Sequence, residues 1–596
     1  MANVFETITH TCDLCIVGGG LAGTIAALAA ARGGSKVVLI QDRPVLGGNC
    51  SSEIRMWIRG AKGLYNKESG ILAELEEENI YRNPTLAPTL WDSVLYGKIK
   101  ENKNITLLLN ASCLAAECDG NTIKTVTAWQ LTTYTWHKVS AKLFADCSGD
   151  SVLAPLTGAL HRIGREANHE FGETIGPKQA DSKTMGMSLL LQARETDHPV
   201  PFIPPHWANI YESDDDFAYI PYVQVQHSTY RDHRVSPGRN LWWMELGGEG
   251  PAIVNTEETR DELLKVAFGI WDHIKNRGDH GAANWELEWV GFLPGKRESV
   301  RYIGDHILTQ HDILSGGNFP DVVAYGGWPM DDHNPKGMLA NSKNDTPSVL
   351  HPAPSPYGIP YRCLYSANID NLFFAGRNIS ATHAALSSTR VMGTCALLGQ
   401  AVGTAAAICT EKNILPRQLM GELVEKLQQQ LSDDGVFLPG VPRKVSDLTL
   451  SVATNLQDAK ILFNGIDRPR IEEGENSVIL PASGTLEFTW EQPTKVSALR
   501  LCFDPDYSRE SVSPAKKLQL FAQKLHVGKN FVPLKVASSI VKAFEVYADG
   551  VLVYQTGCNY HSLVKIPIGK TATRLTVICK ETWGKPEVRL FGCDVT

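Results

Sequence analysis

The hydrophobic pattern at the start of the chain predicts a strand, a tight turn, a helix and a second strand. Residues 13–17 form a short apolar run, residues 21–32 are rich in alanine, and residues 36–40 are again apolar. Two short apolar runs on either side of a longer alanine-rich segment are typical of parallel strands joined by a helix. The pattern therefore predicts an α/β fold for the N-terminal part.

The pattern changes after residues 437–442, a segment with two prolines and a glycine that we interpret as a linker. Beyond it the chain alternates between apolar and polar positions, which is typical of half-buried strands. Asp549-Gly550 joins two of these runs and is a favoured signal for a type I′ hairpin. Short strands at this spacing predict a jelly-roll β-sandwich. The clearest runs are residues 486–490, 498–503, 544–548, 551–554 and 574–578.

Length, composition and charge narrow the class of protein. A chain of 596 residues exceeds what one hydrophobic core usually serves, so at least two domains are expected. The net charge is −8, and no Lys/Arg run is interleaved with aromatic residues. Binding to nucleic acid needs a surface that neutralises phosphates, so we do not expect a nucleic-acid partner.

Cysteine usage and the apolar N-terminal run bear on localisation. The thirteen cysteines show no framework spacing, which indicates free thiols in a reducing compartment and a cytoplasmic protein. Residues 14–31 are uncharged, but acidic residues precede them and three glycines divide them. We therefore predict neither a signal peptide nor a membrane helix. A signal removed from the natural protein would make it periplasmic.

The turn after the first strand has the G-x-G-x-x-G spacing of a dinucleotide site, with Gly18, Gly20 and Gly23. Gly18 would make the tight turn, Gly20 would admit a pyrophosphate, and Gly23 would let the helix pack on the strand. The helix N-terminus would add free N–H groups and a positive dipole end. The alternative is a glycine-rich turn with no ligand.

The position that usually binds the ribose hydroxyls departs from the common pattern. An acid is expected at the end of the second strand, but Gln41 stands there and Asp42 follows it. A glutamine amide can also accept a hydrogen bond from a hydroxyl. Both residues remain candidates for binding the ribose.

Three further segments resemble the signatures of glutathione-reductase-like FAD proteins. The run RPVLGGNCSSE (43–53) resembles the GG signature, and residues 143–150 resemble the strand that ends in a glycine turn. The run NLFFAGR (371–377), followed by a Gly/Ala-rich helix at about 389–409, resembles the last signature. Four elements in the right order imply FAD bound non-covalently. The resemblance implies cofactor contacts by Arg43, Gly47, Gly48, Cys50, Ser52, Arg55, Cys113, Gly149, Gly376, Arg377 and Met392.

Cys50 follows the GG pair, where disulfide reductases of this fold carry a redox cysteine. Their second cysteine lies five residues later, and Arg55 occupies that position here. Dithiol–disulfide exchange is therefore not expected, and Cys50 should pack near the flavin.

The wider sequence resembles a bacterial family of FAD-dependent oxidoreductases that carry the label of xanthan-lyase-related proteins. The stretches GGNCSSEIRMWIRGA and GIPYRCLYSANIDNLFFAGRNISATHAALSSTRVMGTC contribute most, and the resemblance covers about residues 10–435. It implies a carbohydrate or glycoside substrate. The C-terminal part resembles galactose-binding-like modules, which bind glycans or brace another domain; we favour bracing.

These observations predict an FAD-binding domain at 1–160 and 360–436, with a Rossmann-like α/β fold. An α+β substrate region at 161–359 is inserted in it, and an all-β sandwich occupies 446–596.

Candidate catalytic residues follow from what alcohol oxidation by a flavin requires, namely a base and a group that stabilises negative charge. His383 follows the last FAD strand and is a candidate base or orienting group. Arg390 is a candidate stabiliser of negative charge, or part of a structural ion pair. Asp332 and His333 lie in a Gly/Pro-rich loop, where catalytic residues are often carried. We predict no metal there, because the triplet beginning at Asp331 offers too few ligands.

Several other charged and aromatic residues could either support the fold or contact the cofactor or substrate. We expect Arg297 and Glu298 to form ion pairs between domains, whereas Glu53 and Arg55 could face the flavin or substrate. Some tryptophans could stack on sugar rings, although most should be core. The candidates are Trp57, Trp242, Trp243 and Trp328.

We therefore predict an FAD-dependent oxidoreductase in which hydride passes from a carbinol carbon of a carbohydrate to flavin N5. Oxidation to a ketone would also permit redox-neutral glycoside cleavage through a keto-sugar. The alternatives are a dehydrogenase or monooxygenase of a non-sugar metabolite, and a non-catalytic carbohydrate-binding protein with a vestigial flavin site. The expected binding partner is a small-molecule carbohydrate or glycoside substrate. The sequence is also compatible with assembly into a homo-oligomer.

Overall fold

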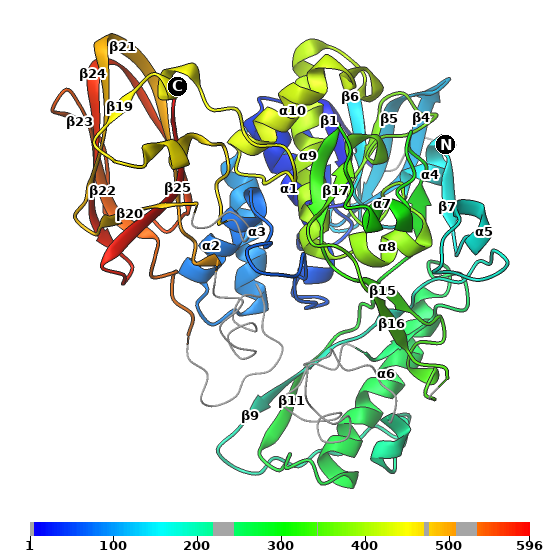
Figure 1. Cartoon of the computed structure of the whole chain (residues 1–596). Coiled ribbons are helices and arrows are strands. Elements are labelled where there is room, and N and C mark those ends of the chain that lie inside the picture. The colour runs from blue at the N-terminus through cyan, green and yellow to red at the C-terminus, as the bar shows by residue number, and fades with distance from the viewer. Residues whose placement is uncertain (1–4, 218–242, 343, 470–475, 508–532) are drawn as a thin grey trace.

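The computed structural model describes residues 5–217, 243–342, 344–469, 476–507 and 533–596. Figure 1 shows a large α/β body that carries the N-terminal strands, a lower part around α6, and a separate β-sandwich at the C-terminal end. The α/β fold and the all-β C-terminal part predicted from the sequence are confirmed.

The central sheet of the α/β body is mixed, with strand order β3-β2-β1-β6-β5-β4. Its parallel half arises because the chain crosses over through helices, and its antiparallel edge is a meander. The long strand β6 pairs with β5 along its first half and with β18 at its end, where Phe373 lies opposite Ala145. The strands are β1 (Thr7–Val17), β2 (Val37–Ile40), β3 (Ile105–Leu108), β4 (Ala111–Asp119), β5 (Thr122–Gln130), β6 (Thr135–Asp146) and β18 (Leu372–Phe374).

Helices cover this sheet. The principal ones are α1 (Leu21–Arg32), α2 (Ile71–Arg82), α3 (Pro88–Glu101), α8 (His383–Thr389), α9 (Met392–Lys412) and α10 (Glu422–Asp433), with α4 (Leu153–Thr157), α5 (Asn168–Phe171) and α7 (Gln310–Leu314) shorter. The segment expected as one helix at about 389–409 is therefore preceded by a separate short helix. Among the described residues α9 alone is long and apolar enough to cross a membrane, and 94% of its apolar window is buried inside the protein.

The lower part in Figure 1 contains small antiparallel sheets packed around α6 (Thr256–Asp272). Strands β8, β10 and β12 form one sheet, and β9 pairs with β11. The strand β15 forms a hairpin with β16. The pairs β14–β17 and β7–β13 belong to the α/β body above, where β14, β17 and β13 contribute to its core. The strands are β7 (His161–Ile163), β8 (Met187–Ser188), β9 (Leu191–Glu195), β10 (Glu245–Leu246), β11 (Trp285–Val290), β12 (Gly295–Lys296), β13 (Val300–Tyr302), β14 (Val322–Gly326), β15 (Met330–His333), β16 (Ser348–His351) and β17 (Tyr357–Pro360).

The C-terminal sandwich has its own hydrophobic core and antiparallel strands throughout. The predicted hairpin is confirmed, because Ala548 pairs with Val551, and Asp549 and Gly550 have φ values of 46° and 80°. Both values are positive, as a type I′ turn requires. The elements are α11 (Asp447–Leu450), β19 (Ala453–Thr454), β20 (Val478–Pro481), β21 (Thr485–Phe503), β22 (Val541–Ala548), β23 (Val551–Thr556), β24 (Leu563–Thr582) and β25 (Glu587–Val595).

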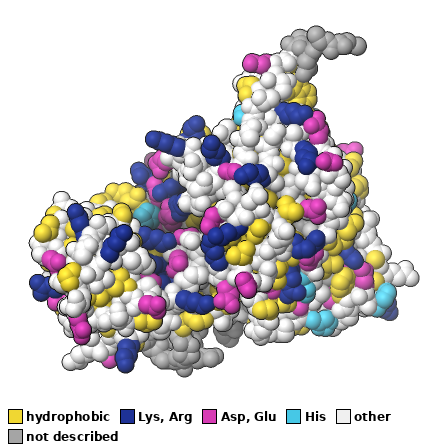
Figure 2. Space-filling model, turned by 90° about the horizontal axis from the view of Figure 1, so that it is seen from above, with side chains coloured by type: hydrophobic (Ala, Val, Ile, Leu, Met, Phe, Trp, Pro, Cys, Tyr) yellow, Lys and Arg dark blue, Asp and Glu magenta, His cyan; other side chains and the backbone are white. Residues whose placement is uncertain are grey.

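Polar contacts join the sandwich to the α/β body. The Ser562 backbone N–H donates to Glu77 of α2 at 3.1 Å, and Arg468 donates to the Tyr65 carbonyl at 3.0 Å while lying 4.0 Å over the Phe437 ring. On the face shown in Figure 2, acidic and basic side chains are interspersed over both bodies.

The close packing of α1 against α9 positions the first glycine turn, and it depends on two glycines of α9. A Cβ atom added to Gly399 would lie 2.2 Å from the Ala22 carbonyl oxygen, and one added to Gly403 would lie 2.2 Å from that of Ala26. These positions are four residues apart in each helix, so the two backbones approach along one stripe.

We expect Gly399→Ala to destabilise the protein by about 1–3 kcal/mol, because the added methyl group must push the helices apart. Thermal unfolding monitored by circular dichroism would show a lower Tm. Gly97→Ala in α3 is the matched control, since a Cβ there meets no atom within 4 Å. That substitution should be neutral or stabilise by up to about 1 kcal/mol through helix propensity. Equal effects of the two substitutions would contradict the packing argument.

Candidate active site

The three glycines of the first turn differ in what surrounds them. Gly18 has φ = +102°, and a Cβ there would lie 2.4 Å from the Ser148 backbone nitrogen. At Gly23 a Cβ would lie 1.9 Å from the Gly18 carbonyl oxygen. At Gly20 the nearest atom would be 3.9 Å away. Gly18 and Gly23 are therefore required by the protein's own packing, whereas Gly20 faces open space.

The space beside Gly20 is a cavity bounded by the GG turn and by the start of α9. Gly47 pairs with Gly20 through a parallel bridge and donates its N–H to the Gly19 carbonyl at 2.9 Å. Nine of the residues predicted from the sequence as cofactor contacts or catalytic groups line this cavity: Gly20, Gly47, Gly48, Gly149, His333, Gly376, Arg377, Arg390 and Met392. The structure thus brings together residues from segments more than three hundred positions apart.

The two ribose candidates lie at the edge of the turn, outside the lining of the cavity. Gln41 is buried; its side-chain oxygen accepts from the Gly19 N–H at 2.7 Å, and its amide donates to the Val45 carbonyl at 3.1 Å. These bonds connect the glycine turn to the following loop. Asp42 is exposed, and the neighbouring Arg43 forms a two-point ion pair with Glu53. The choice between Gln41 and Asp42 remains a prediction.

Four other residues proposed as cofactor contacts are also outside the lining of the cavity. The Cys50 thiol donates to the Gly47 carbonyl at 3.1 Å, and burial raises its pKa to about 12, which makes it unreactive. The Ser52 N–H donates to Asp92 at 3.0 Å. Arg55 lies 4.0 Å over the Trp289 ring. Cys113 is buried in β4, and burial likewise raises its pKa to about 12.

A partly buried carboxylate, Asp150, organises the charges beside Gly149. Lys296 donates to it at 2.7 Å and Arg377 at 2.8 Å, and the Ser299 hydroxyl donates to it at 2.8 Å. Burial alone would raise the pKa of Asp150, but the two cations outweigh that effect and hold it well below the usual range. Lys296 and Arg377 are consequently fixed with their charges at the cavity.

The hairpin of β15 and β16 forms another wall, and the alternation of its side chains decides what faces the cavity. Asp331 and His333 lie on one face of β15 and line the cavity, as do Leu350 and Ser348, their partners on β16. Asp332 points to the opposite face. Successive residues of one strand thus serve two different charge clusters.

The cluster on the cavity side contains a histidine between two carboxylates. Glu245 lies 2.6 Å from His333 Nδ1, and Asp331 lies 3.1 Å from Nε2. Arg297 and Arg390 lie 3.5 and 3.4 Å from these two carboxylates. Burial would lower the pKa of His333, but Glu245 and Asp331 outweigh it and raise the pKa above its ordinary value. The two carboxylates therefore favour the protonated form of His333.

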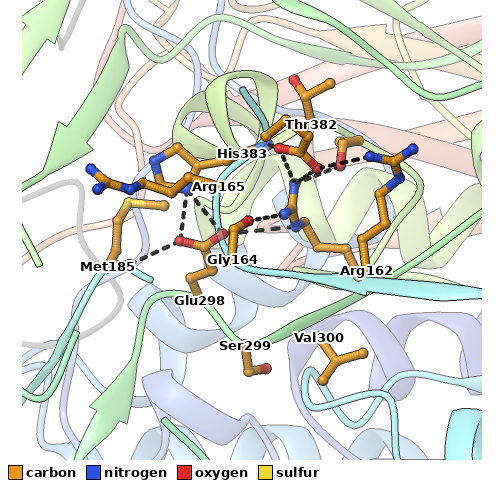
Figure 3. Close-up of polar contacts among 12 residues, drawn as sticks. Arg162, Gly164, Arg165, Met185, Glu298, Ser299, Val300, Thr382 and His383 are labelled. Atoms are coloured by element: carbon orange, nitrogen blue, oxygen red, sulfur yellow. Dashed lines mark hydrogen bonds and ion pairs between the residues drawn. The ribbon is translucent and has the colours of Figure 1, made fainter. Parts of the chain in front are cut away.

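The second cluster centres on His383, the first residue of α8, which is 2% exposed and does not line the cavity. Glu298 lies 2.9 Å from its Nδ1 and Asp332 lies 3.0 Å from its Nε2. Figure 3 shows the Glu298 carboxylate between this ring and the Met185 backbone N–H, which donates to it at 2.8 Å. Burial lowers the pKa of His383, but the two carboxylates raise it more strongly, to about 10.

Aromatic and cationic side chains lie at the same cavity. Trp57 and Trp328 line it together with Arg59 and Lys62, and the Lys62 ammonium lies 4.5 Å over the Trp328 ring. Trp243 belongs to the core around α6, and Trp242 lies outside the described residues.

The shape and the polar groups of the cavity are suitable for binding FAD. Gly20, Gly47 and Gly48 expose bare backbone where a diphosphate needs close approach, and the N-terminus of α1 begins there. Arg390 Nε and Trp328 Nε1 are buried with no hydrogen-bond partner among the described residues, so both can donate to a bound group. The Lys296–Asp150–Arg377 cluster supplies further positive charge.

The chain belongs to the FAD dependent oxidoreductase family, whose sequence profile matches residues 13–431. The protein is thus an FAD-dependent oxidoreductase. A search of curated protein sequences gives no match.

The solved structures that match this chain are distant from it. The match to L-proline dehydrogenase from P. horikoshii has 20% identity and a TM-score of 0.16, and covers 27% of this chain and 26% of that one. A geranylgeranyl bacteriochlorophyll reductase-like protein from Thermoplasma acidophilum has 12% identity and a TM-score of 0.30, and the match covers 72% of this chain and 86% of that one. The quinol fumarate reductase subunit of E. coli has 13% identity and a TM-score of 0.27, and the match covers 72% of this chain and 75% of that one.

Sequence reasoning missed three residues of the site. Glu245 precedes its partner His333 by 88 positions, so no local pattern connects the two. Asp150 ends the segment 143–150 that carries part of the resemblance, and Lys296 directly precedes Arg297. A lysine after Pro-Gly and an acid after a glycine turn are the signals that could have found them.

We expect Gly20→Val to abolish FAD binding while the apoprotein stays folded, because the new side chain enters the cavity and meets no protein atom within 3.9 Å at its Cβ. The cost to the apoprotein should be about 1 kcal/mol, from the poorer helix cap. Flavin absorbance per protein and the Tm of the apoprotein measure the two effects. Gly23→Ala is the contrasting variant and should lower the apoprotein Tm as well. Normal flavin content in Gly20→Val would contradict this placement.

The raised pKa of His383 predicts a pH-dependent contribution to stability. A group whose pKa is raised by folding stabilises the protein fully below its unfolded pKa, and this contribution is lost as pH rises through the folded value of about 10. The Tm difference between the natural protein and His383→Gln should therefore be largest near pH about 6 and shrink toward pH about 10. Thermal unfolding at several pH values tests this, and a difference independent of pH would argue against the charged histidine.

Proposed function

We propose that the protein oxidises a carbinol carbon of a carbohydrate or glycoside. The observation that carries the proposal is the composition of the cavity, where two tryptophans lie together with the Asp331–His333 pair. Indole faces suit the apolar C–H faces of sugar rings, and the polar pair suits a hydroxyl. FAD, when bound, supplies the acceptor for the two electrons and the hydrogen that the carbon loses.

His333 and Asp331 are the groups placed to orient the hydroxyl and to receive its proton as a pair. Glu245 acts as a positioning residue, because it holds the other ring nitrogen of His333 at 2.6 Å. The pair must first lose the proton that the two carboxylates retain on His333. Oxidation should consequently require a pH above the ordinary histidine pKa, in the direction of the shift.

The charge of the cluster favours the negative oxygen that develops as the proton leaves. Arg297, Arg390 and protonated His333 oppose two carboxylates, so one positive charge is in excess. Arg390 lines the cavity and its Nε has no hydrogen-bond partner among the described residues, so it can donate to the substrate or to the cofactor. Donors fixed in a water-poor site stabilise such charge effectively.

The proposal includes a redox-neutral branch. A ring ketone acidifies the neighbouring C–H, so the pair can remove that proton and an aglycone can leave by elimination. After water adds, the two electrons and the hydrogen that FAD would have taken up would return to the ketone carbon, so the net reaction would be hydrolysis of the glycoside with no external oxidant. Product analysis distinguishes the branches, because a stable keto-sugar as sole product excludes the second.

We expect anaerobic titration with a panel of glycosides to bleach the oxidised-flavin absorbance for at least one of them. His333→Gln should slow this bleaching by about 10²–10⁴-fold, the usual contribution of a general base. Its flavin content should stay normal. The rate in the natural protein should rise with pH, with a midpoint above the ordinary histidine value.

His306→Gln is the matched control, because His306 also pairs with an aspartate, Asp312, at 3.0 Å but does not line the cavity. It should bleach at the natural rate. A yellow protein that no sugar bleaches would refute the carbohydrate proposal and favour a non-sugar substrate.

A further inference from the structure

Two histidines and an aspartate converge at the C-terminal end of α6, in the lower part of Figure 1. The helix continues into a π-helical turn (His273–Arg277), which is followed by His280, and Asp214 begins a 3-10 turn (Asp214–Phe217). His273 Nε2 lies 2.8 Å from Asp214 Oδ1 and 3.1 Å from His280 Nε2. His280 Nε2 lies 3.2 Å from the same oxygen. Each residue therefore directs one ligand-type atom to a common point.

The spacing of these atoms suits a bound metal ion. Bonds of about 2.0–2.1 Å in a tetrahedral zinc site place neighbouring ligand atoms about 3.3–3.4 Å apart. The three separations in the protein, 2.8, 3.1 and 3.2 Å, are shorter than this by at most about 0.6 Å. Small outward movements of the side chains would admit the ion.

The protonation of His273 supports a cation at this point. Its Nδ1 lies 2.8 Å from the Tyr211 carbonyl, which can only accept, so the proton of the neutral ring belongs on Nδ1. Nε2 then presents its lone pair to a carboxylate oxygen and to a second imidazole. A cation between the atoms makes this arrangement favourable, whether it is a metal ion or a proton carried by one of the two rings. A backbone carbonyl that fixes the ring in this way is the usual second-shell partner of a metal-bound histidine.

Gly278 is a second, independent observation. A Cβ atom there would lie 2.2 Å from His280 Nε2 and 3.0 Å from His273 Nε2. Its φ is −93°, which any residue adopts, so the backbone does not require glycine. Glycine is needed at this position to leave space beside the two ligand atoms.

We propose that Asp214, His273 and His280 bind one divalent transition-metal ion, with zinc as the first candidate. Imidazole ligands favour zinc and its neighbours over magnesium or calcium. His273 is 1% exposed and Asp214 is 57% exposed, so the fourth position faces solvent and takes water. The ion ties the turn at residue 214 to α6 and to the core beneath it, which includes Trp271 and Ile274. None of the three ligands lines the flavin cavity.

The test uses the untagged, flavin-loaded full chain after removal of metal by a chelator. Titration with Zn²⁺ against a chromophoric chelator should show one equivalent bound, and Co²⁺ should give the visible absorption of a tetrahedral site. His280→Gln and Asp214→Asn should each weaken binding at least about 100-fold, since loss of even an outer partner costs about 10- to 100-fold. Flavin content should not change in either variant.

His198→Gln is the matched control, because His198 pairs with Asp197 at 2.6 Å on the surface and neither belongs to the cluster. It should bind zinc like the natural protein. Absence of stoichiometric binding at micromolar zinc, or equal binding by His280→Gln and the natural protein, would overturn the proposal. Normal circular dichroism spectra of the two variants, whose replaced side chains are not fully buried, would show that weakened binding reflects the missing ligand.

Discussion

The need to pair buried charge governs the wall of the flavin cavity. Glu245, Asp331 and His333 form one set and Glu298, Asp332 and His383 the other, and strand β15 supplies residues to both. Removing one member of such a set leaves an uncompensated buried charge, which costs about 3–5 kcal/mol. A slip of β15 by one residue would exchange its two faces and unpair both sets at once. The charges therefore fix the register of the hairpin, and the register fixes which groups reach the cavity.

The second constraint is the close approach of backbones around the first glycine turn. Gly23 lets α1 begin against the turn, and Gly399 and Gly403 let α9 lie along α1. Because α9 begins at the cavity with Met392, its distance from α1 determines the width of the space between the GG turn and Arg390. Glycines buried between the two helices thus influence the dimensions of a cavity that they do not line.

Local rules were sufficient to predict the parts of the fold that depend on few neighbouring residues. The turn at Gly18–Gly23 and the hairpin at Asp549-Gly550 follow from backbone preferences, and the order of the FAD signatures indicated the parallel strands that carry them. The pairing of His333 with Glu245 depends on tertiary register, to which no local pattern gives access. His383 shows the same limit: its place in the chain suggested a position beside the flavin, but α8 directs it to the face of β15 away from the cavity. Arg55 was a candidate for the same reason, and it stacks on Trp289.

The division of charge between the two clusters also separates their chemical roles. His383 is enclosed by carboxylates and shielded from the cavity, so the proton it carries remains in place over the pH range in which most enzymes work. His333 has equivalent partners and is equally buried, at 2% exposed, but it contributes to the lining of the cavity, where the proposed substrate hydroxyl would compete for its proton. Arg297 and Arg390 make release of that proton easier, because they oppose a further positive charge on the ring. On the proposed function, His383 stabilises the scaffold, whereas His333 exchanges a proton during turnover. The same residue type, held between the same kind of partners, thus differs in its position relative to the cavity and in its neighbouring charges.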